Sequence, residues 1–488
     1  MKEVFKKKSV VNGDKSLKKK SKNGGGARNK AKKSDIKKSN NKVKNIKKNV
    51  QVGIESIGFY TSSSFFALKD LAHEKSKDKN KTEEENKKTE EYLVNKYEKG
   101  LGQTSMSIIK PSEDIITMAY DAVSRCLGSY KLSEDIDLLL FATESAVDNS
   151  KSAACELYGL FEHEEGHQCR CIEVKHACYG GTGALMMAKE HIFNNPDKKA
   201  LVVMSDIAFY GIETKGEPTQ GCGAVAILLS SDPKIAVLNN DNVFFSSNKN
   251  DFYRPVYQTK PLYDGKFSIK CYLEMFKKTY DEYIKKNESF DFLISHMPFA
   301  RMLDKCCEMV KIDKENNKNE YIKYLQKYIG NTYTASLYIG LYSLLVFEPE
   351  YKNLYGKKIA LFSYGSGAEC EMFSVTILKN YDKYLKQKLP NNIKDTTNNV
   401  ACRINNSDNA VNLGENFFRL SIEVLLGKLV NYINYKEYCR LLEKFENREK
   451  SLDWDGIELK IKNGVRCYRE EICNRDDTAV ELKNHKKS

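Results

Sequence analysis

Residues 175–183 read Lys-His-Ala-Cys-Tyr-Gly-Gly-Thr-Gly and place a cysteine, Cys178, where an apolar strand meets a helix. The preceding residues Cys171–Lys175 alternate as strand residues do, and Ala184–Phe193 is a run of good helix formers. Cys178 is therefore expected in the turn just before a helix N-terminus. A strand, a turn and a helix in this order are the first sign of an α/β chain.

The position of Cys178 favours a thiolate. Free backbone N–H groups and the positive end of the helix dipole stabilise an anion there. Gly180, Gly181 and Gly183 would let the backbone approach a substrate closely. A buried structural cysteine is the alternative, and it is the default for any one of the fourteen cysteines. Because only Cys178 has this glycine-rich helix start, we predict that it is a nucleophile.

The chain has 488 residues, so we expect two domains or one large fused core. Its net charge of +13 is unevenly spread: residues 1–50 hold 19 Lys and Arg against Glu3, Asp14 and Asp35, a net of +16, which leaves −3 for the rest. This basic tail carries too little apolar surface to fold, so we predict that it is disordered.

The function of the tail is open. It is either a solvated appendage or an arm that contacts an anionic surface. No nucleic acid is required, because Phe5 is its only aromatic residue and bases would find no stacking partner. The chain contains no secretory segment and no apolar run of membrane length. The cysteines are then most simply reduced thiols of a cytoplasmic protein.

Strand and helix patterns alternate along the body, which predicts an α/β fold with a largely buried sheet. The later part of the chain again shows alternating strand and helix patterns, with a glycine-rich turn after a strand. We therefore expect an internal duplication. Polar stretches at His73–Glu91, Asp313–Glu320 and Pro390–Asn409 are predicted to be surface insertions. The expected strands are Val52–Phe59, Ile136–Ala142, Arg170–Val174, Ala200–Met204, Ala224–Leu229, Phe290–Ser295 and Lys358–Phe362, and the expected helices are Pro111–Leu127, Ser152–Leu160, Ala184–Phe193 and Tyr333–Val346.

Glu144 follows the apolar strand Leu138–Ala142. Ligands gather at the carboxyl ends of strands in α/β sheets. Burial beside apolar surface raises the pKa of a carboxyl group, which suits a general acid or base near neutral pH. The alternative is an exposed glutamate that caps a helix.

His296 also ends an apolar strand, and Pro298 stops that strand soon after. An imidazole there can shuttle a proton or donate a hydrogen bond to a carbonyl. Arg301 and Lys305 lie four residues apart, so on a helix they share a face and could meet a phosphate. Both patterns also occur in ordinary core or surface positions.

The stretch His163-Glu-Glu-Gly-His167 matches the H-E-x-x-H pattern of zinc proteases. Those enzymes need both histidines on one face of a stable helix, whereas Gly166 weakens a helix and a strand starts soon afterwards. We therefore predict no metal site here or elsewhere.

From about Val52 to about Leu378 the chain resembles the 3-hydroxy-3-methylglutaryl-CoA (HMG-CoA) synthases of the thiolase superfamily, and it looks closer to the bacterial form. The resemblance depends on many motifs in the same order. They are Gly100-Leu-Gly-Gln-Thr-Ser-Met106, Ala142-Thr-Glu-Ser-Ala-Val-Asp-Asn-Ser-Lys151, Ala177-Cys-Tyr-Gly-Gly-Thr182, Ser205-Asp-Ile-Ala-Phe-Tyr210, Gly216-Glu-Pro-Thr-Gln-Gly221, Arg254-Pro-Val, Ser295-His-Met-Pro-Phe299, Gly330-Asn-Thr-Tyr-Thr334 and Phe362-Ser-Tyr-Gly-Ser-Gly367.

The resemblance implies a thiolase-like fold of five layers, αβαβα, built from two similar halves at residues 51–231 and 232–488, and a homodimer. It implies condensation of acetyl-CoA with acetoacetyl-CoA in the mevalonate pathway, with coenzyme A thioesters as substrates and no cofactor. Cys178 would carry the acetyl group, Glu144 would act as general base and His296 would position acetoacetyl-CoA. The implied substrate-binding residues are Tyr210, Thr219, Asn331 and Ser366 at the acyl group and Arg301 and Lys305 at the coenzyme A phosphate.

Two alternatives stay open. One is a β-branching synthase whose acceptor is a β-ketoacyl chain on an acyl carrier protein. The other is a non-catalytic scaffold that keeps the fold while its basic tail binds RNA or a membrane.

Overall fold

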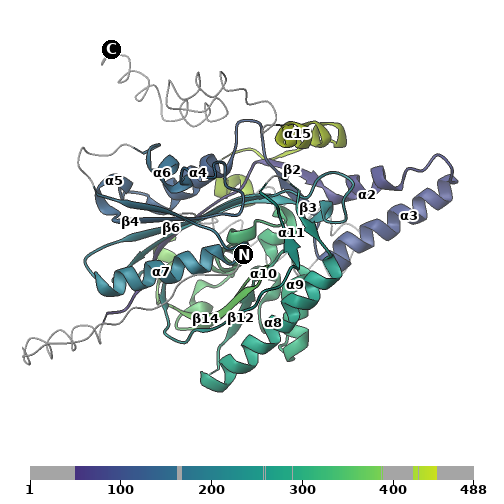
Figure 1. Ribbon diagram of the computed structural model, residues 1–488. Coiled ribbons are helices and arrows are strands. Elements are labelled where there is room, and N and C mark those ends of the chain that lie inside the picture. Colours follow the sequence, from purple (N-terminus) through teal and green to yellow (C-terminus); the bar gives the residue numbers. More distant parts are fainter. Residues whose placement is uncertain are drawn as a thin grey trace, which may run out of the picture. The chain divides into compact units, whose positions relative to one another are not determined.

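Figure 1 shows the computed structural model of the chain. It describes residues 50–161, 168–256, 258, 260–287, 289–385, 387, 421–426 and 428–447. Residues 1–50 and residues 51–488 form two separate units, and the description below concerns the second. The basic tail up to residue 49, the His163–His167 motif and the insertion at Pro390–Asn409 lie outside the described residues.

One hydrogen-bonded sheet runs through the described part of the body in the order β12-β13-β14-β8-β1-β7-β6-β4-β5, with β9 also paired to β14. The first half supplies β1 (Gly53–Tyr60), β4 (Leu138–Ala142), β5 (Arg170–Val174), β6 (Ala200–Ala208) and β7 (Gly221–Ser230). The second half supplies β8 (Ala236–Leu238), β9 (Val243–Ser246), β12 (Phe292–Ser295), β13 (Lys358–Gly365) and β14 (Glu369–Ile377). Each of the seven predicted strands overlaps one of these.

The strand pairing repeats between the two halves. In the first half β4 is parallel to β6, β6 is antiparallel to β7, and β7 is antiparallel to β1. In the second half β12 is parallel to β13, β13 is antiparallel to β14, and β14 is antiparallel to both β8 and β9. This repeat is what an internal duplication produces, while the boundary at residues 231 and 232 stays a prediction.

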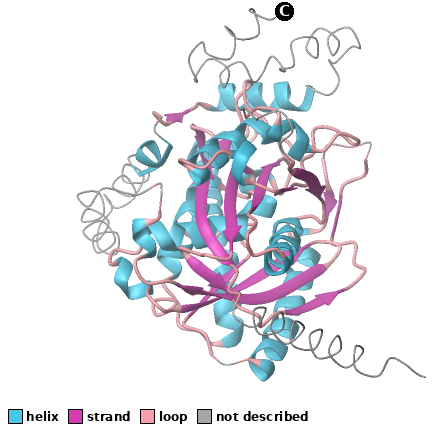
Figure 2. Ribbon diagram, turned by 90° about the vertical axis from the view of Figure 1, so that its left-hand side faces the viewer, coloured by secondary structure: helices cyan, strands magenta, loops and turns pink. Residues whose placement is uncertain are grey.

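Helices lie outside both halves of the sheet and between them, which gives the predicted αβαβα order (Figure 2). On one outer side α4 (Ile115–Leu127) and α6 (Ala153–Tyr158) pack on the first half, and on the other α8 (Gly265–Lys286) and α9 (Arg301–Val310) pack on the second. The middle layer holds α7 (Gly180–Asn194) and α12 (Ser336–Phe347). All twelve residues of α12 are buried, as expected for a helix that is apolar on every side.

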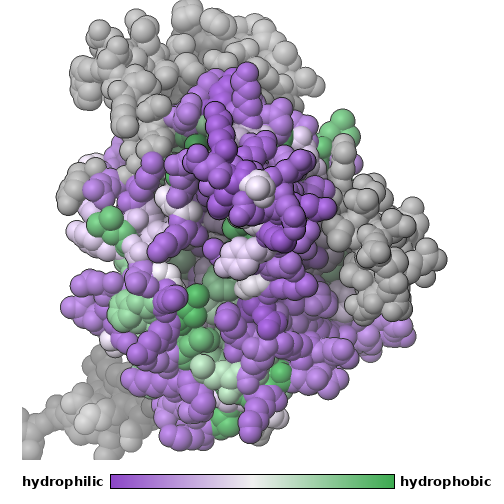
Figure 3. Space-filling view, turned by 90° about the vertical axis from the view of Figure 1, so that its right-hand side faces the viewer, coloured by the Kyte–Doolittle hydropathy of each residue, from purple (hydrophilic) through white to green (hydrophobic). Residues whose placement is uncertain are grey.

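The insertion at His73–Glu91 lies at the surface, as predicted, but it is helical. The chain forms α2 (Leu68–Ser76) and α3 (Glu83–Asn95), and α3 buries none of its residues. Thr82 and Glu85 form a reciprocal capping box that starts α3. The face of the molecule that carries this helical hairpin is mostly hydrophilic (Figure 3).

A small sheet lies beside the hairpin. It contains β2 (Ser64–Ala67), β3 (Ser105–Ile108) and β15 (Asn431–Tyr432), and helix α15 (Tyr435–Asn447) follows β15. Buried apolar side chains of β2, β3, α2 and α15 form one cluster. The hairpin and the C-terminal helix are therefore packed into the same apolar core.

The stretch Asp313–Glu320 was predicted to be a surface insertion, and this is wrong for two of its residues. Asn317 and Asn319 are 2% and 1% exposed. The Asn317 side chain donates to the carbonyl of Leu293 at 2.9 Å and accepts from its N–H at 2.7 Å. It thereby satisfies the backbone groups of Leu293 in β12, the strand that leads to His296. No helix among the described residues is long and apolar enough to cross a membrane.

Candidate active site

Cys178 lies in a tight turn between β5 and α7. Helix α7 begins at Gly180, four residues earlier than predicted, so the glycines are part of its first turn. Ala177 has a φ of 41°, a left-handed conformation that residues with a side chain rarely adopt. Strain of this kind is held in place by surrounding structure and is common at functional sites.

The glycines of this turn serve close packing inside the protein. A β-carbon on Gly181 would lie 2.9 Å from the carbonyl oxygen of Thr334 and 3.0 Å from Met204. A β-carbon on Gly365, at the end of β13, would lie 2.7 Å from the carbonyl oxygen of His176. Gly181 therefore has a packing role, since it lets α7 approach its neighbours, while a close approach of substrate at Gly180 and Gly183 stays a prediction.

The structure brings Cys178 and Glu144 together, although they are 34 residues apart. The Cys178 thiol donates a hydrogen bond to Oε1 of Glu144 at 3.2 Å. Burial raises the pKa of Cys178 well above its usual value, and the carboxylate of Glu144 raises it further. The predicted thiolate is thus wrong for the resting site, because desolvation and a neighbouring negative charge outweigh the helix dipole.

Glu144 is a buried carboxyl group rather than an exposed helix cap. Its side chain is 8% exposed. Burial raises the pKa of Glu144 to about 7, while the nearby Arg254 guanidinium opposes that rise. A carboxyl group with this pKa exchanges a proton readily at neutral pH, which suits it to take a proton from a thiol or from carbon.

Two residues that the sequence analysis did not single out hold Glu144. Asp206, at the end of β6, accepts from the Glu144 N–H at 2.8 Å, and its other oxygen accepts from the Thr334 N–H at 3.1 Å. Arg254 donates to the Glu144 carbonyl at 2.6 Å and to the Tyr333 hydroxyl at 3.0 Å. Both belong to motifs quoted above, and an acid at a strand end was the available signal for Asp206.

His296 follows the last residue of β12, as predicted, and it is 3% exposed. Burial lowers the pKa of His296 to about 3, so its ring is neutral at physiological pH. Its backbone N–H donates to Phe362 of β13 at 2.8 Å, and the hydroxyl of Tyr272 donates to its carbonyl at 2.7 Å. The Cys178 turn packs against Gly365 at the end of β13, so β13 links that turn to the strand of His296.

The predicted acyl-binding residues fall in two places. Asn331 is buried, and its amide donates to the Tyr210 hydroxyl at 3.2 Å. Thr219 accepts through its carbonyl from the Asn331 N–H at 3.0 Å, so these three residues form one group. Tyr210 and Tyr333 form an apolar cluster to which Cys178 contributes. Ser366 lies in the turn between β13 and β14 and is partly buried.

Arg301 and Lys305 lie on the first turns of α9, as predicted. Arg301 forms ion pairs with Asp304 at 3.1 Å and Glu308 at 2.9 Å. Lys305 is partly exposed and forms no hydrogen bond or ion pair with any residue that the structure describes. A phosphate would therefore meet Lys305 directly, whereas Arg301 would have to exchange a carboxylate partner.

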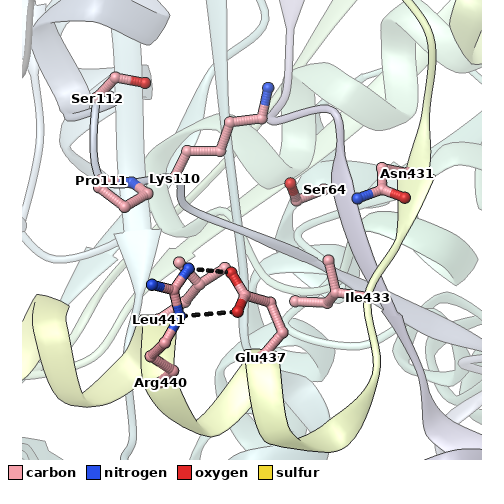
Figure 4. A pocket seen from close by; sticks show the side chains of 9 residues that line it. All are labelled: Ser64, Lys110, Pro111, Ser112, Asn431, Ile433, Glu437, Arg440 and Leu441. Carbon is pink, nitrogen blue, oxygen red and sulfur yellow. Dashed lines mark hydrogen bonds and ion pairs between the residues drawn. The ribbon is translucent and has the colours of Figure 1, made fainter.

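A separate pocket of about 430 Å³ lies between α15 and the loop at residues 110–112, and Figure 4 shows its lining. Glu437 and Arg440 of α15 pair with each other there. None of the candidate site residues lines this pocket. It is therefore distinct from the group around Cys178.

A duplicated five-layer α/β fold with a partly buried cysteine paired to a glutamate defines a condensing acyltransferase of the thiolase type. The family models for the N-terminal and C-terminal regions of hydroxymethylglutaryl-coenzyme A synthase match residues 49–234 and residues 241–320 and 299–419. The chain belongs to the HMG-CoA synthase family.

Individual relatives agree with this family. The hydroxymethylglutaryl-CoA synthase of Enterococcus faecalis is 36% identical over 349 residues, which cover 69% of this chain and 86% of that protein. A crystal structure of an HMG-CoA synthase complexed with CoA has a TM-score of 0.62 at 36% identity and covers 71% of this chain and 87% of that one. MvaS in complex with 3-hydroxy-3-methylglutaryl coenzyme A has a TM-score of 0.61 at 29% identity, over 80% and 92% of the two chains.

Proposed function

We propose that this enzyme condenses acetyl-CoA with acetoacetyl-CoA and water to give 3-hydroxy-3-methylglutaryl-CoA and free CoA, in the mevalonate pathway. The observation that carries the proposal is the hydrogen bond of 3.2 Å from the Cys178 thiol to Glu144. It joins a nucleophile to a base inside a buried site of an HMG-CoA synthase family member.

In the first step Glu144 takes the thiol proton, and the sulfur of Cys178 attacks the carbonyl carbon of acetyl-CoA. The bond from that carbon to the sulfur of CoA breaks, and CoA leaves as a thiol with the proton that Glu144 returns to it, so that Glu144 is ionised again. Glu144 is suited to this because its pKa of about 7 makes it both a competent base and a competent acid at neutral pH.

In the second step Glu144 removes a proton from the methyl group of the acetyl thioester. The resulting carbanion equivalent attacks the ketone carbon of acetoacetyl-CoA, and the ketone oxygen takes up a proton. His296 is neutral, with a pKa of about 3, so it meets that oxygen as a hydrogen-bond donor. Water then hydrolyses the thioester bond to Cys178 and releases the product.

The other candidate residues would hold the substrates. Tyr210, Thr219 and Asn331 form one hydrogen-bonded group near Cys178 and would contact the acyl group, together with Ser366. Lys305, with Arg301, would meet the coenzyme A phosphate. No cofactor is proposed, because every step uses groups of the chain and its substrates. We also propose a homodimer, as the family resemblance implies. We further propose a reducing compartment such as the cytoplasm, since the eleven described cysteines are free thiols.

The experiment that tests this proposal is intact-protein mass spectrometry after brief incubation with acetyl-CoA, for the wild type and for Cys178→Ala. We expect one acetyl group on the wild type and none on the variant, and we expect acetoacetyl-CoA to discharge it with release of 3-hydroxy-3-methylglutaryl-CoA. An acetyl group that only a carrier-bound β-ketoacyl chain discharges would favour the β-branching alternative. Absence of acetylation would refute the role of Cys178.

A further inference from the structure

The loop at residues 211–220 carries Thr219, one of the candidate acyl-binding residues, and hydrogen bonds from other parts of the chain hold this loop in place. Gln220 accepts, through one side-chain oxygen, from the backbone N–H groups of Tyr210 and Gly211, each at 2.9 Å. The backbone of this loop also binds Asn331 through the carbonyl of Thr219 at 3.0 Å. The placement of Tyr210 therefore depends on the side chain of Gln220.

Gln220 is itself held by the C-terminal helix. Its side-chain nitrogen donates to the hydroxyl of Tyr438 at 3.1 Å, and that hydroxyl donates to Glu217 at 2.9 Å. Tyr438 is fully buried, and its ring stacks on Phe66 of β2 with centroids 4.3 Å apart. The hydroxyl of Tyr438 thus has a donor and an acceptor in fixed positions.

Glu217 is the charged centre of this group. It is 0% exposed and accepts from the Glu213 N–H at 2.8 Å. Lys75 of the α2–α3 hairpin forms an ion pair with it at 2.5 Å. A buried carboxylate is tolerated only when such partners satisfy it, so the insertion hairpin and the C-terminal helix both contribute to one buried network.

We propose that Tyr438 is a positioning residue for the condensation reaction: with Glu217, Gln220 and Lys75 it fixes the loop that places Tyr210 and Asn331 beside Cys178. The inference builds on the proposed function, since it assigns a part of the chain outside the family motifs to the same site. Tyr438 is not one of the candidate substrate-binding residues, and it would act through two successive hydrogen bonds, from Gln220 to its hydroxyl and from Tyr210 to Gln220.

The test compares Tyr438→Phe, which keeps the stacked ring but loses the hydroxyl, with the wild type. Tyr435→Phe is the matched control, because Tyr435 lies one turn away on α15 and packs on the same Phe66 ring without bonding to Glu217 or Gln220. The first readout is the rate constant of single-turnover acetylation of Cys178, which is measured by intact-protein mass spectrometry at a temperature where all of the proteins are folded. The second is hydrogen exchange of the peptide that contains Tyr210 and Gly211.

We expect Tyr438→Phe to acetylate every active site with a rate constant lowered about tenfold, since small misplacements of positioning groups have effects of this size or larger. We also expect faster exchange at Tyr210 and Gly211, with Tyr435→Phe unchanged in both readouts. If Tyr438→Phe has a normal rate constant but fewer sites that react, the role of Tyr438 is purely structural and the inference is overturned. Unchanged hydrogen exchange at Tyr210 and Gly211 would also overturn it.

The two proposals fail separately. A wild type that takes no acetyl group refutes the proposed function, while the exchange measurement still decides whether Tyr438 fixes the loop. If Tyr438→Phe does not fold, Lys75→Met is measured in the same way, because it removes another partner of Glu217. A normal acetylation rate constant and normal hydrogen exchange in Lys75→Met would then overturn the inference.

Discussion

The residue that sets the chemistry of this site is Glu144. Burial raises its pKa to about 7, and Arg254, whose guanidinium lies 3.8 Å from Oε2, acts in the opposite direction. Asp206 adds to the upward shift. Burial therefore has the largest effect on the pKa of Glu144, and two charged neighbours of opposite sign adjust it.

This balance predicts the effect of Arg254→Met on pH dependence. Without the guanidinium the ionised form of Glu144 loses its stabilising partner, so its pKa rises. Acetylation of Cys178 requires ionised Glu144 in the proposed reaction, so its rate falls as the pH is lowered. In Arg254→Met this fall should occur at a pH about one unit higher than in the wild type. The measurement is the acetylation rate from pH 5 to pH 9.

Arg440→Met is the control for this experiment, because it also removes one positive charge but lies on α15 and pairs with Glu437. Its pH profile should match that of the wild type. If the rate of Arg254→Met falls at the same acidic pH as the rate of the wild type, the role given to the guanidinium is contradicted.

At the scale of elements, α7 begins two residues after Cys178 and packs closely against its neighbours. The helix approaches β6 and the backbone near Thr334 at Gly181, where a β-carbon would be 2.9 Å from a carbonyl oxygen. Backbone atoms cannot move away as the end of a flexible side chain can. The packing of this one helix therefore requires glycine.

Gly181→Ala should accordingly destabilise the protein by about 1–3 kcal/mol, the usual effect of overpacking a filled interior. Gly265→Ala is the matched control: Gly265 begins α8, and a β-carbon there has nothing within 4 Å. Alanine at that position should be neutral or slightly stabilising. The free energies of unfolding of both variants are measured by urea denaturation. Equal values for the two variants would show that α7 has room to shift.

At the scale of the whole molecule, the sequence predicted what is encoded locally. The strands, the turn of Cys178 and the strand-end positions of Glu144 and His296 follow from short patterns, and the family motifs predicted the layered fold. The contacts that determine reactivity join distant residues: Asp206 binds Thr334, and Tyr438 binds Glu217. Local patterns do not show burial, so they predicted a thiolate where the folded protein holds a thiol.

The basic tail supplies a prediction at this scale, because it carries a net charge of +16 while the body has a net charge of about −3. Removing residues 1–49 should leave kcat/KM for both substrates unchanged within about twofold, since the proposed reaction uses only residues of the body. The same truncation should abolish retention on a cation-exchange resin at low salt. A truncated enzyme with impaired catalysis would show that the tail takes part in the reaction.

The hydrogen bond between Cys178 and Glu144 also has a consequence for the chemical durability of the enzyme. Peroxides and simple alkylating agents attack thiolates, and a thiol held neutral by burial and by an adjacent carboxylate presents very little of that form. In the proposed reaction the sulfur becomes a nucleophile when Glu144 takes its proton as a thioester is attacked. We therefore expect the resting enzyme to react slowly with oxidants, because of the same pairing that prepares it for its substrate.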